Sequence, residues 1–336
     1  MKHILVTGGA GFVGSVVAET LIQQGYRVTV IDNLSGGNRS AVDPKASLVV
    51  ADLADEEALA KLFKSNQFDG IMHFAAEALI DGSMTDPYLY FFANDVVGLR
   101  LLEAARQHGV KKFVFSSTSA VYGLPKQLPM RETDLPEPIN SYGLSKLIFE
   151  QILQWYQKAY GFQIVCFRYF NAAGATQKLG ECRPSESHLI PIAMQAALGQ
   201  RSMLHMFGTD YDTEDGTCVR DFTHVKDIAQ AHILGFEKIE KLTQRIFNLG
   251  SGRPYSVRQV IELTREISQK DIPVKESPRR PGDVEAMQAD IRLAKTHLGW
   301  DPKHSDLKTI LQDAWQWHVA HPNGYADTAQ TSHLSR

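Results

Sequence analysis

Short apolar runs alternate with longer stretches of helical spacing through the first half of the chain. The apolar runs, which are typical of buried strands, cover Ile4–Val6, Val28–Ile31, Leu48–Val50, Gly70–Phe74, Phe113–Ser116 and Ile164–Phe167. The stretches between them predict helices over Val13–Gln24, Glu56–Lys64, Leu99–His108 and Leu144–Tyr160. This alternation predicts an α/β fold: a Rossmann-like, doubly wound parallel sheet that helices cover on both faces.

The pattern becomes less regular after Asn171. The sequence there predicts strands over Asp221–Val225 and Ile246–Leu249, and helices over Leu189–Leu198, Asp227 to about Lys238, Ser256–Ser268, Ile291–Leu298 and Leu307–Val319. We therefore expect a large α/β domain formed by residues 1–171 and about 219–251. A smaller mixed α/β C-terminal lobe would contain about 172–218 and 252–326, and residues 327–336 read as a polar, flexible tail.

Composition excludes several classes of partner. The 336 residues carry a formal net charge of -3, so nothing suggests a nucleic-acid partner. No apolar run is as long as a membrane span, and the N-terminus lacks the pattern of a secretory signal, so we expect no membrane partner and a cytoplasmic location. Three cysteines without metal-like spacing indicate reduced thiols and no metal site.

A glycine-rich segment, Thr7-Gly8-Gly9-Ala10-Gly11-Phe12-Val13-Gly14, lies between the first predicted strand and the first predicted helix. Glycines at 8, 11 and 14 allow a tight turn, a close approach of the backbone to a pyrophosphate, and close packing of helix on strand. Asp32 ends the second predicted strand, where an acid can bind ribose hydroxyls and repel a 2′-phosphate. The sequence therefore predicts a dinucleotide site that favours NAD over NADP. Strand ends at Asp52-Leu53 and Phe74-Ala75-Ala76 are further candidate contacts.

Tyr142 and Lys146 are four residues apart in Ser141-Tyr142-Gly143-Leu144-Ser145-Lys146, so they share one face of a predicted helix. A tyrosine hydroxyl is a weak base at its ordinary pKa of about 10, and a nearby cation lowers that pKa. Upstream, the strand Phe113–Ser116 runs into Ser117-Thr118, whose hydroxyls can bridge a substrate oxygen and the phenol. These residues are candidates for general acid–base catalysis on an alcohol.

The glycine loop, the hydroxyl-ended strand and the Tyr-x-x-x-Lys spacing resemble the extended short-chain dehydrogenase/reductase superfamily. Within it, the chain resembles the UDP-glucose 4-epimerases from residue 3 to about 325. The segments that carry this resemblance are Asp32-Asn33-Leu34, His73–Ala76, Ser116–Gly123, Arg168–Asn171, Phe207–Tyr211, Asp215–Asp221 and Arg279–Asp283.

The resemblance implies reversible inversion at C4 of a UDP-hexose through a 4-keto sugar, with tightly bound NAD and a homodimeric enzyme. It implies Tyr142 as base, with Thr118 and Lys146 as catalytic partners, NAD in the larger domain and the UDP-sugar in the smaller lobe. Further cofactor contacts would come from Phe12, Val13, Asn33, Asn94, Ser116 and Tyr169. Substrate contacts would come from Thr118, Tyr142, Asn171, His188, Leu189, Leu204, His205, Met206, Phe207, Arg220, Phe222, Arg280, Asp283 and Met287.

One gate position and two departures from the family bear on the substrate, and one departure is Phe222, which stands where some members have tyrosine near the uridine. Met287 stands where residue size decides whether N-acetylated sugars enter, and methionine is intermediate and flexible, so use of UDP-N-acetylhexosamines stays open. His188 follows Ser187 where relatives often have two asparagines. The dimer would be formed by helices over about Pro87–His108 and Tyr142–Tyr160.

Other functions compete with this interpretation. A UDP-pentose or UDP-uronate 4-epimerase stays open, because C4 chemistry does not depend on the C6 group. A nucleotide-sugar 4,6-dehydratase is disfavoured, because Ser119-Ala120 follows Thr118 where dehydratases have acids. A non-catalytic NAD-binding protein would not need the intact Tyr142 and Lys146.

Overall fold

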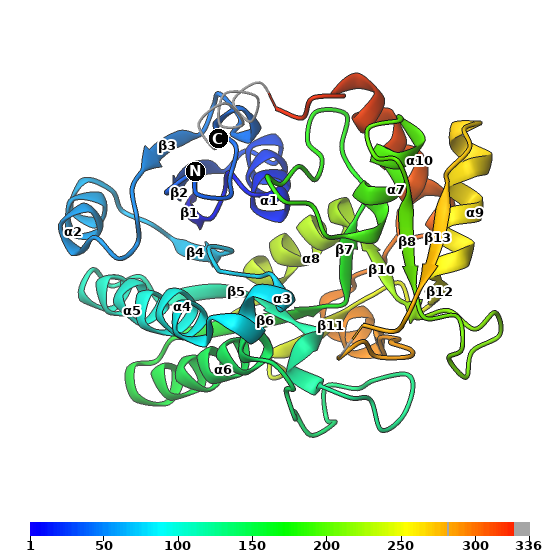
Figure 1. The fold of residues 1–336 in the computed structure, drawn as a ribbon. Helices are drawn as coiled ribbons and strands as arrows, with labels where there is room; N and C mark the ends of the chain where they lie inside the picture. Colours follow the sequence, from blue (N-terminus) through cyan, green and yellow to red (C-terminus); the bar gives the residue numbers. More distant parts are fainter. Residues whose placement is uncertain (281, 326–336) are drawn as a thin grey trace.

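The computed structural model describes residues 1–280 and 282–325, and a seven-stranded parallel sheet forms its centre (Figure 1). The strands lie in the order β11-β6-β5-β4-β1-β2-β3. Their bounds are β1 His3–Thr7, β2 Arg27–Asp32, β3 Ser47–Val50, β4 Gly70–His73, β5 Lys112–Thr118, β6 Gln163–Tyr169 and β11 Ile246–Leu249. The predicted Rossmann-like α/β fold is confirmed.

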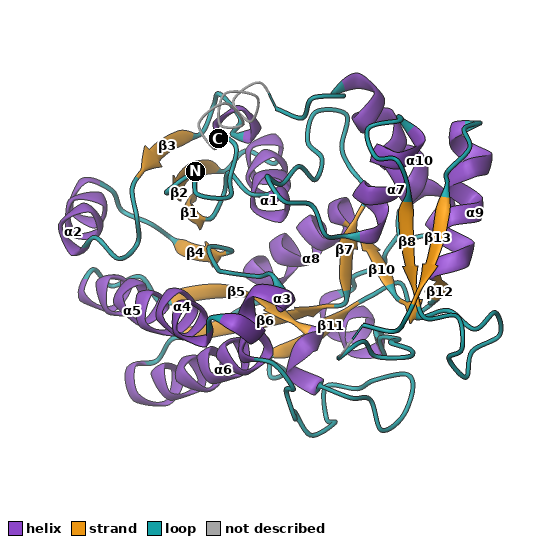
Figure 2. Ribbon diagram, viewed as in Figure 1, coloured by secondary structure: helices purple, strands orange, loops and turns teal. Residues whose placement is uncertain are grey.

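Helices cover both faces of this sheet (Figure 2). On one face lie α1 (Phe12–Gln23), α8 (Val225–Lys238) and the π-helical turn η4 (Ala294–Leu298). On the other lie α2 (Glu56–Ser65), α5 (Val97–Gln107) and α6 (Ser141–Tyr160). In β1, Ile4 and Val6 belong to the first core and Leu5 to the second, because successive side chains of a strand point to opposite faces. Both faces are therefore buried, which explains why the strands are continuously apolar.

The helix α5 is the last part of a continuous helical segment. It runs from α4 (Pro87–Phe91) through a π-helical turn, η2 (Phe92–Val96), into α5, and the short helix α3 (Ile80–Thr85) precedes it. Asp86 caps α4 by accepting a hydrogen bond from the Leu89 backbone N–H. The predicted helix over Leu99–His108 is therefore the last part of a longer one. The 3-10 turns η1 (Arg39–Ala41) and η3 (Ser119–Tyr122) complete this half.

The remaining elements form a second lobe, at the right of Figure 1. Here α7 (Leu189–Ala197), α9 (Val257–Ser268) and α10 (Leu307–Ala320) pack together beside the parallel pair β8 (Leu204–Phe207) and β13 (Val274–Ser277). Two further pairs join β7 (Asn171–Ala173) to β10 (Phe222–His224), and β9 (Val219–Arg220) to β12 (Tyr255–Ser256).

Several predictions in this half need correction. The strand expected over Asp221–Val225 covers only Phe222–His224, because Val225 already begins α8. This strand pairs with β7 and lies outside the large sheet. Strands β7, β8, β9, β12 and β13 were not predicted, since segments of two to four residues are too short to carry an alternating pattern. The tail expected at 327–336 lies outside the described residues. Among the described residues, no helix combines the length and apolarity needed to cross a membrane.

Candidate active site

The order of strands in the large sheet reverses between β1 and β4, and the predicted cofactor residues lie at this point. From β1 the chain proceeds to β2 and β3 on one side, and then to β4, β5 and β6 on the other. Open parallel sheets bind ligands outside the carboxyl ends of their strands at such a reversal. The loops after β1 and β4, together with the ends of β2 and β5, therefore define the candidate active site.

The glycine loop and the loop after β4 approach each other closely. Gly8 has a φ of 66°, and a Cβ built on it would lie 2.5 Å from the Ala75 backbone nitrogen. A Cβ on Gly14 would lie 2.3 Å from the Gly8 carbonyl oxygen, where α1 packs on the turn. No side chain fits at either position, so both glycines are needed for the turn and the packing that the sequence predicts.

The N-terminus of α1 has donors available for an anion. Its N-cap is Gly11, which has no side chain to cap the helix, and the first turn contains no acidic residue. A Cβ on Gly11 would meet only the Gly8 carbonyl oxygen, at 3.4 Å, so this side of the loop is open. The first backbone N–H groups of a helix bind phosphate well when nothing else caps them. This arrangement fits a pyrophosphate.

Asp32 lies at the end of β2 and orders the loops around it. One carboxylate oxygen accepts a hydrogen bond from the Ala10 N–H at 2.9 Å, and the other accepts from the Leu34 N–H at 2.8 Å. Beside it, the Asn33 amide donates to an Asp52 carboxylate oxygen at 2.9 Å. The structure therefore brings together the predicted adenosine-side residues.

Tyr142 and Thr118 meet because α6 begins against the end of β5. Asn140 caps α6 by accepting a hydrogen bond from the Gly143 N–H at 2.7 Å. A Cβ on Gly143 would lie 2.5 Å from the Ala120 carbonyl oxygen, so this close approach requires glycine. The Thr118 hydroxyl faces the Tyr142 phenol and lowers its pKa. The predicted base and its hydroxyl partner are thus adjacent.

Burial raises the pKa of Tyr142, and two interactions oppose this effect. One is the interaction with the Thr118 hydroxyl, and the other is the positive charge of Arg183, which the sequence did not indicate. Arg183 lies between β7 and α7, far from Tyr142 in sequence, and only the fold brings them close. Arg183 therefore adds positive charge beside the phenol.

Lys146 is buried one helical turn after Tyr142. Its Nζ donates a hydrogen bond to the Ser116 carbonyl oxygen at 3.1 Å and lies 4.8 Å from the centre of the Phe115 ring. Burial lowers the pKa of Lys146 to about 8, and the carboxylates of Asp95 and Glu150 partly counter this. The expected effect of Lys146 on the tyrosine pKa stays a prediction.

Several predicted cofactor residues are held by protein contacts. The Asn94 amide donates to Ser145 Oγ at 2.9 Å and to the Glu77 carbonyl oxygen at 3.0 Å, and it accepts from the Glu77 N–H at 2.9 Å. The Tyr169 hydroxyl lies 2.6 Å from His232 Nε2. Asn94 therefore fixes the loop after β4 to α6, a role that the sequence did not indicate.

Three of the predicted diphosphate and ribose residues form one group in the second lobe. Asp283 lies 3.0 Å from Arg280 Nε and 3.6 Å from Arg220 Nη2, and the Arg280 guanidinium lies 4.8 Å from the centre of the Phe207 ring. The structure therefore clusters residues that are separated by up to 63 positions in the sequence (220 to 283). Two arginines on one carboxylate leave donors that can bind a diphosphate.

Other predicted substrate residues are constrained by packing. The side chains of Leu204 and Met206 belong to the core between β8, α7 and α9, so only their backbone can reach a ligand. Phe222 is also a core residue. The Asn171 amide donates to the Asp221 carbonyl oxygen at 2.8 Å. Met287 is half-buried. His205 is exposed, and Leu189 is half-buried at the start of α7.

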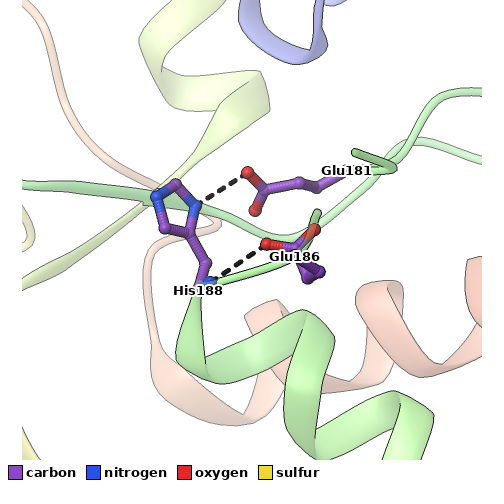
Figure 3. A group of neighbouring side chains, drawn as sticks. All are labelled: Glu181, Glu186 and His188. Carbon is purple, nitrogen blue, oxygen red and sulfur yellow. Dashed lines mark hydrogen bonds and ion pairs between the residues drawn. The ribbon is translucent and has the colours of Figure 1, made fainter. Parts of the chain in front are cut away.

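His188, at the N-terminus of α7, forms a charged cluster with Glu181 and Glu186 (Figure 3). Its Nδ1 lies 2.8 Å from a Glu181 carboxylate oxygen, and its backbone N–H donates to Glu186 at 3.0 Å. The Glu181 charge raises the pKa of His188. Three such side chains can ligate a metal ion, but Arg183 also lies 3.0 Å from Glu181 and supplies positive charge. We interpret the cluster as an ion-pair network.

Comparison with known proteins agrees with this geometry. The profile of the NAD dependent epimerase/dehydratase family matches residues 4–250. The chain is 46% identical to UDP-glucose 4-epimerase from Halalkalibacterium halodurans, over 96% of this chain and 97% of that protein. A UDP-glucose 4-epimerase from Bifidobacterium longum, solved with NAD+ and UDP, superposes with a TM-score of 0.91 at 35% identity, covering 96% of this chain and 100% of that one. A probable UDP-arabinose 4-epimerase from Arabidopsis thaliana is 38% identical, over 98% of this chain and 84% of that protein.

Proposed function

We propose that this chain, which belongs to the NAD dependent epimerase/dehydratase family, is an NAD-dependent UDP-glucose 4-epimerase. The reaction is the reversible inversion of C4 in a UDP-hexose, which interconverts UDP-glucose and UDP-galactose. The observation that carries this proposal is the Tyr142–Thr118 pair beside the strand reversal that carries the glycine loop. A dehydratase or a non-catalytic protein is not favoured, since the compared relatives are 4-epimerases.

NAD fits the residues at the strand reversal. The glycine loop has no room for side chains at Gly8 and Gly14. The uncapped N-terminus of α1 offers backbone N–H groups as hydrogen-bond donors to the pyrophosphate. Asp32 would bind the adenosine ribose, and Lys146 the nicotinamide ribose. Bound NAD supplies reversible oxidation at the sugar C4. We infer that the domain formed by residues 1–171 and about 219–251 holds it.

Tyr142 is the residue that we assign to proton transfer. As a phenolate it would remove the proton from the 4-hydroxyl, and as a phenol it would return that proton after the sugar has turned. Thr118 would hold the sugar oxygen next to the phenol, since its hydroxyl faces Tyr142. Because burial raises the pKa of Tyr142, positive charge is required to populate the phenolate.

The UDP half of the substrate would lie in the second lobe. Arg220 and Arg280 would bind the diphosphate with forked hydrogen bonds, and Asp283 would accept hydrogen bonds from the uridine ribose. Asn171 and His188 would contact the diphosphate side, and Met287 would lie by the 2-substituent of the sugar. A site between two lobes allows one lobe to hold the cofactor while the other orients the sugar over it.

A homodimer is our proposal for the assembly. Exposed apolar side chains gather on α4, the following helical segment and α6, where the family resemblance implies the dimer interface. They are Tyr88, Leu89, Val96, Leu99, Leu144 and Trp155. Trp155 has 67% of its surface exposed, which is unusual for tryptophan in a monomer. Sedimentation of Leu99→Glu/Trp155→Glu should give a monomer, and an unchanged mass would refute this interface.

The deciding experiment is a coupled assay with UDP-galactose and then with UDP-N-acetylgalactosamine, with and without added NAD. Tyr142→Phe should lower kcat by about two to four orders of magnitude, the usual contribution of a positioned base. Tyr160→Phe, at the far end of the same helix, is the matched control and should keep full activity. Turnover by Tyr142→Phe at the wild-type rate would refute the assignment of the base.

A further inference from the structure

One buried carboxylate near the candidate active site has no hydrogen-bond partner. Asp95 lies in the π-helical turn η2, and its exposed fraction is 9%. Neither of its carboxylate oxygens has a partner among the described residues. An unpaired buried carboxylate costs several kcal/mol unless a charge nearby stabilises it or it is neutral. π-helical turns inside longer helices occur frequently at functional sites.

The charge that faces Asp95 is the ammonium of Lys146. Each affects the other: Asp95 raises the pKa of Lys146, and Lys146 lowers the pKa of Asp95. The neighbour Asn94 binds Ser145, the residue before Lys146, so the turn that carries Asp95 is fixed to the turn of α6 that carries the lysine. The two charges therefore keep a fixed relative position.

Glu150, the other carboxylate that acts on Lys146, is already paired. It accepts hydrogen bonds from Arg168 Nε at 3.0 Å and Nη2 at 2.6 Å, and from the Ser117 hydroxyl at 2.6 Å. The positive charge of Arg168 opposes the field of Glu150 at Lys146, and Asp95 raises the Lys146 pKa more than Glu150 does. On the strand side, Lys146 donates to a carbonyl oxygen and lies over the Phe115 ring, and neither group carries a charge. Asp95 is thus the counter-charge left for the lysine.

We propose that Asp95 is a positioning residue for the epimerase reaction, whose carboxylate keeps the Lys146 ammonium protonated in its buried site. This inference rests on the proposed function, in which the protonated lysine lowers the pKa of Tyr142 and binds the nicotinamide ribose. Asp95 touches no reacting atom in this scheme. It acts by holding positive charge where the phenolate needs it.

The pH dependence follows from the two titrations. Burial raises the pKa of Asp95 to about 7 and lowers that of Lys146 to about 8. The titratable groups that face Lys146 are Asp95 from η2, Glu150 from its own helix, and His73 from β4, whose pKa burial lowers to about 3, so that it stays neutral. Below pH 7 Asp95 is largely neutral and contributes little. Above pH 7 its charge opposes deprotonation of the lysine.

Asp95→Asn tests this inference, with Asp81→Asn on the exposed surface of α3 as the matched control. Below pH 7 Asp95→Asn should turn over UDP-galactose at nearly the wild-type kcat. Above pH 8 its kcat should be about tenfold lower, since its alkaline limb moves down by about one pH unit. An equal loss at every pH would mean a structural role, and an unchanged alkaline limb would mean no role; either refutes the proposal.

A second measurement does not depend on turnover. The ultraviolet absorbance of the Tyr142 phenolate is followed against pH in the NAD-loaded protein, by difference from the same protein carrying Tyr142→Phe. Asp95→Asn should move this titration to higher pH, and an identical curve would refute the proposal. If the wild type turns over no UDP-hexose, the proposed function fails, while the absorbance titration still decides the role of Asp95.

Discussion

Replacing Glu150 with glutamine tests how much of the site depends on one buried ion pair. The side chains of Glu150 and Arg168 are 1% and 3% exposed, and they form a two-pronged ion pair with contacts of 2.6 and 3.0 Å. The Tyr122 ring lies 4.8 Å from the guanidinium, and Arg168 Nη1 has no hydrogen-bond partner among the described residues. Glu150→Gln would leave this guanidinium without the carboxylate that pairs with it.

The expected cost is large because the charge cannot reach water. Removing one partner of a buried ion pair typically costs about 3–5 kcal/mol, since the remaining charge is desolvated and unpaired. Replacing both partners, as in Glu150→Leu/Arg168→Met, removes both charges of the pair. That pair of changes should cost much less than the single one, apart from about 1 kcal/mol for the hydrogen bond that Ser117 loses.

The assay is denaturant unfolding of the three proteins, with Glu262→Gln on the exposed surface of α9 as a control for net charge. Glu150→Gln should lower the free energy of unfolding by several kcal/mol, and Glu262→Gln by less than about 0.5 kcal/mol. A loss below about 1 kcal/mol for Glu150→Gln would refute the reasoning, because it would mean that solvent reaches Arg168.

Three further predictions address the loops, the sheet and the substrate gate. Gly8→Ala should abolish NAD retention, measured as cofactor content after gel filtration, because the new Cβ would lie 2.5 Å from the Ala75 backbone nitrogen. Gly25 also has a positive φ, but a Cβ on it would meet nothing within 4 Å. The control Gly25→Ala should therefore keep NAD and cost only about 1 kcal/mol of stability. Burial lowers the pKa of His73 from 6.5 to about 3, so the folded protein loses stability against unfolding as the pH falls from 6.5 towards 3. In urea unfolding, His73→Phe should lose less free energy of unfolding over that range than the wild type. An equal dependence of the free energy of unfolding on pH would contradict this. Met287→Ala should raise the ratio of kcat/KM for UDP-N-acetylgalactosamine to that for UDP-galactose, and an unchanged ratio would remove this residue from the gate.

Most of the large sheet could be predicted from the sequence, because buried parallel strands and their crossover helices are long enough to show a pattern. The glycine loop, Asp32 and the Tyr142–Lys146 spacing were also identifiable, since each has a required residue type at a required distance along the chain. The short strands of the second lobe were missed, because β9 and β12 contain two residues each and exist only through their mutual pairing.

Arg183 and Asp95 were missed for a different reason. Their importance depends on which side chains the fold places beside them, and nothing in the segments around residues 95 and 183 indicates Lys146 or Tyr142. Asn94 was expected at the cofactor, and that expectation stays a prediction; its contacts with Glu77 and Ser145 were not expected. Local sequence predicts backbone conformation well, whereas the electrostatics of a buried site depend on contacts between distant segments.

The position of β11 has a consequence for how the chain acquires its structure during synthesis. This strand pairs with β6, although the chain between them, from residue 170 to 245, includes much of the second lobe. The helix α8, which packs on α1, lies in the same segment, directly before β11. A ribosome must therefore release about three quarters of the chain before β11 can join β6 and α8 can cover α1. Until then one edge of β6 and an apolar face of α1 are uncovered, so the nascent chain is the form most exposed to aggregation and most dependent on chaperones.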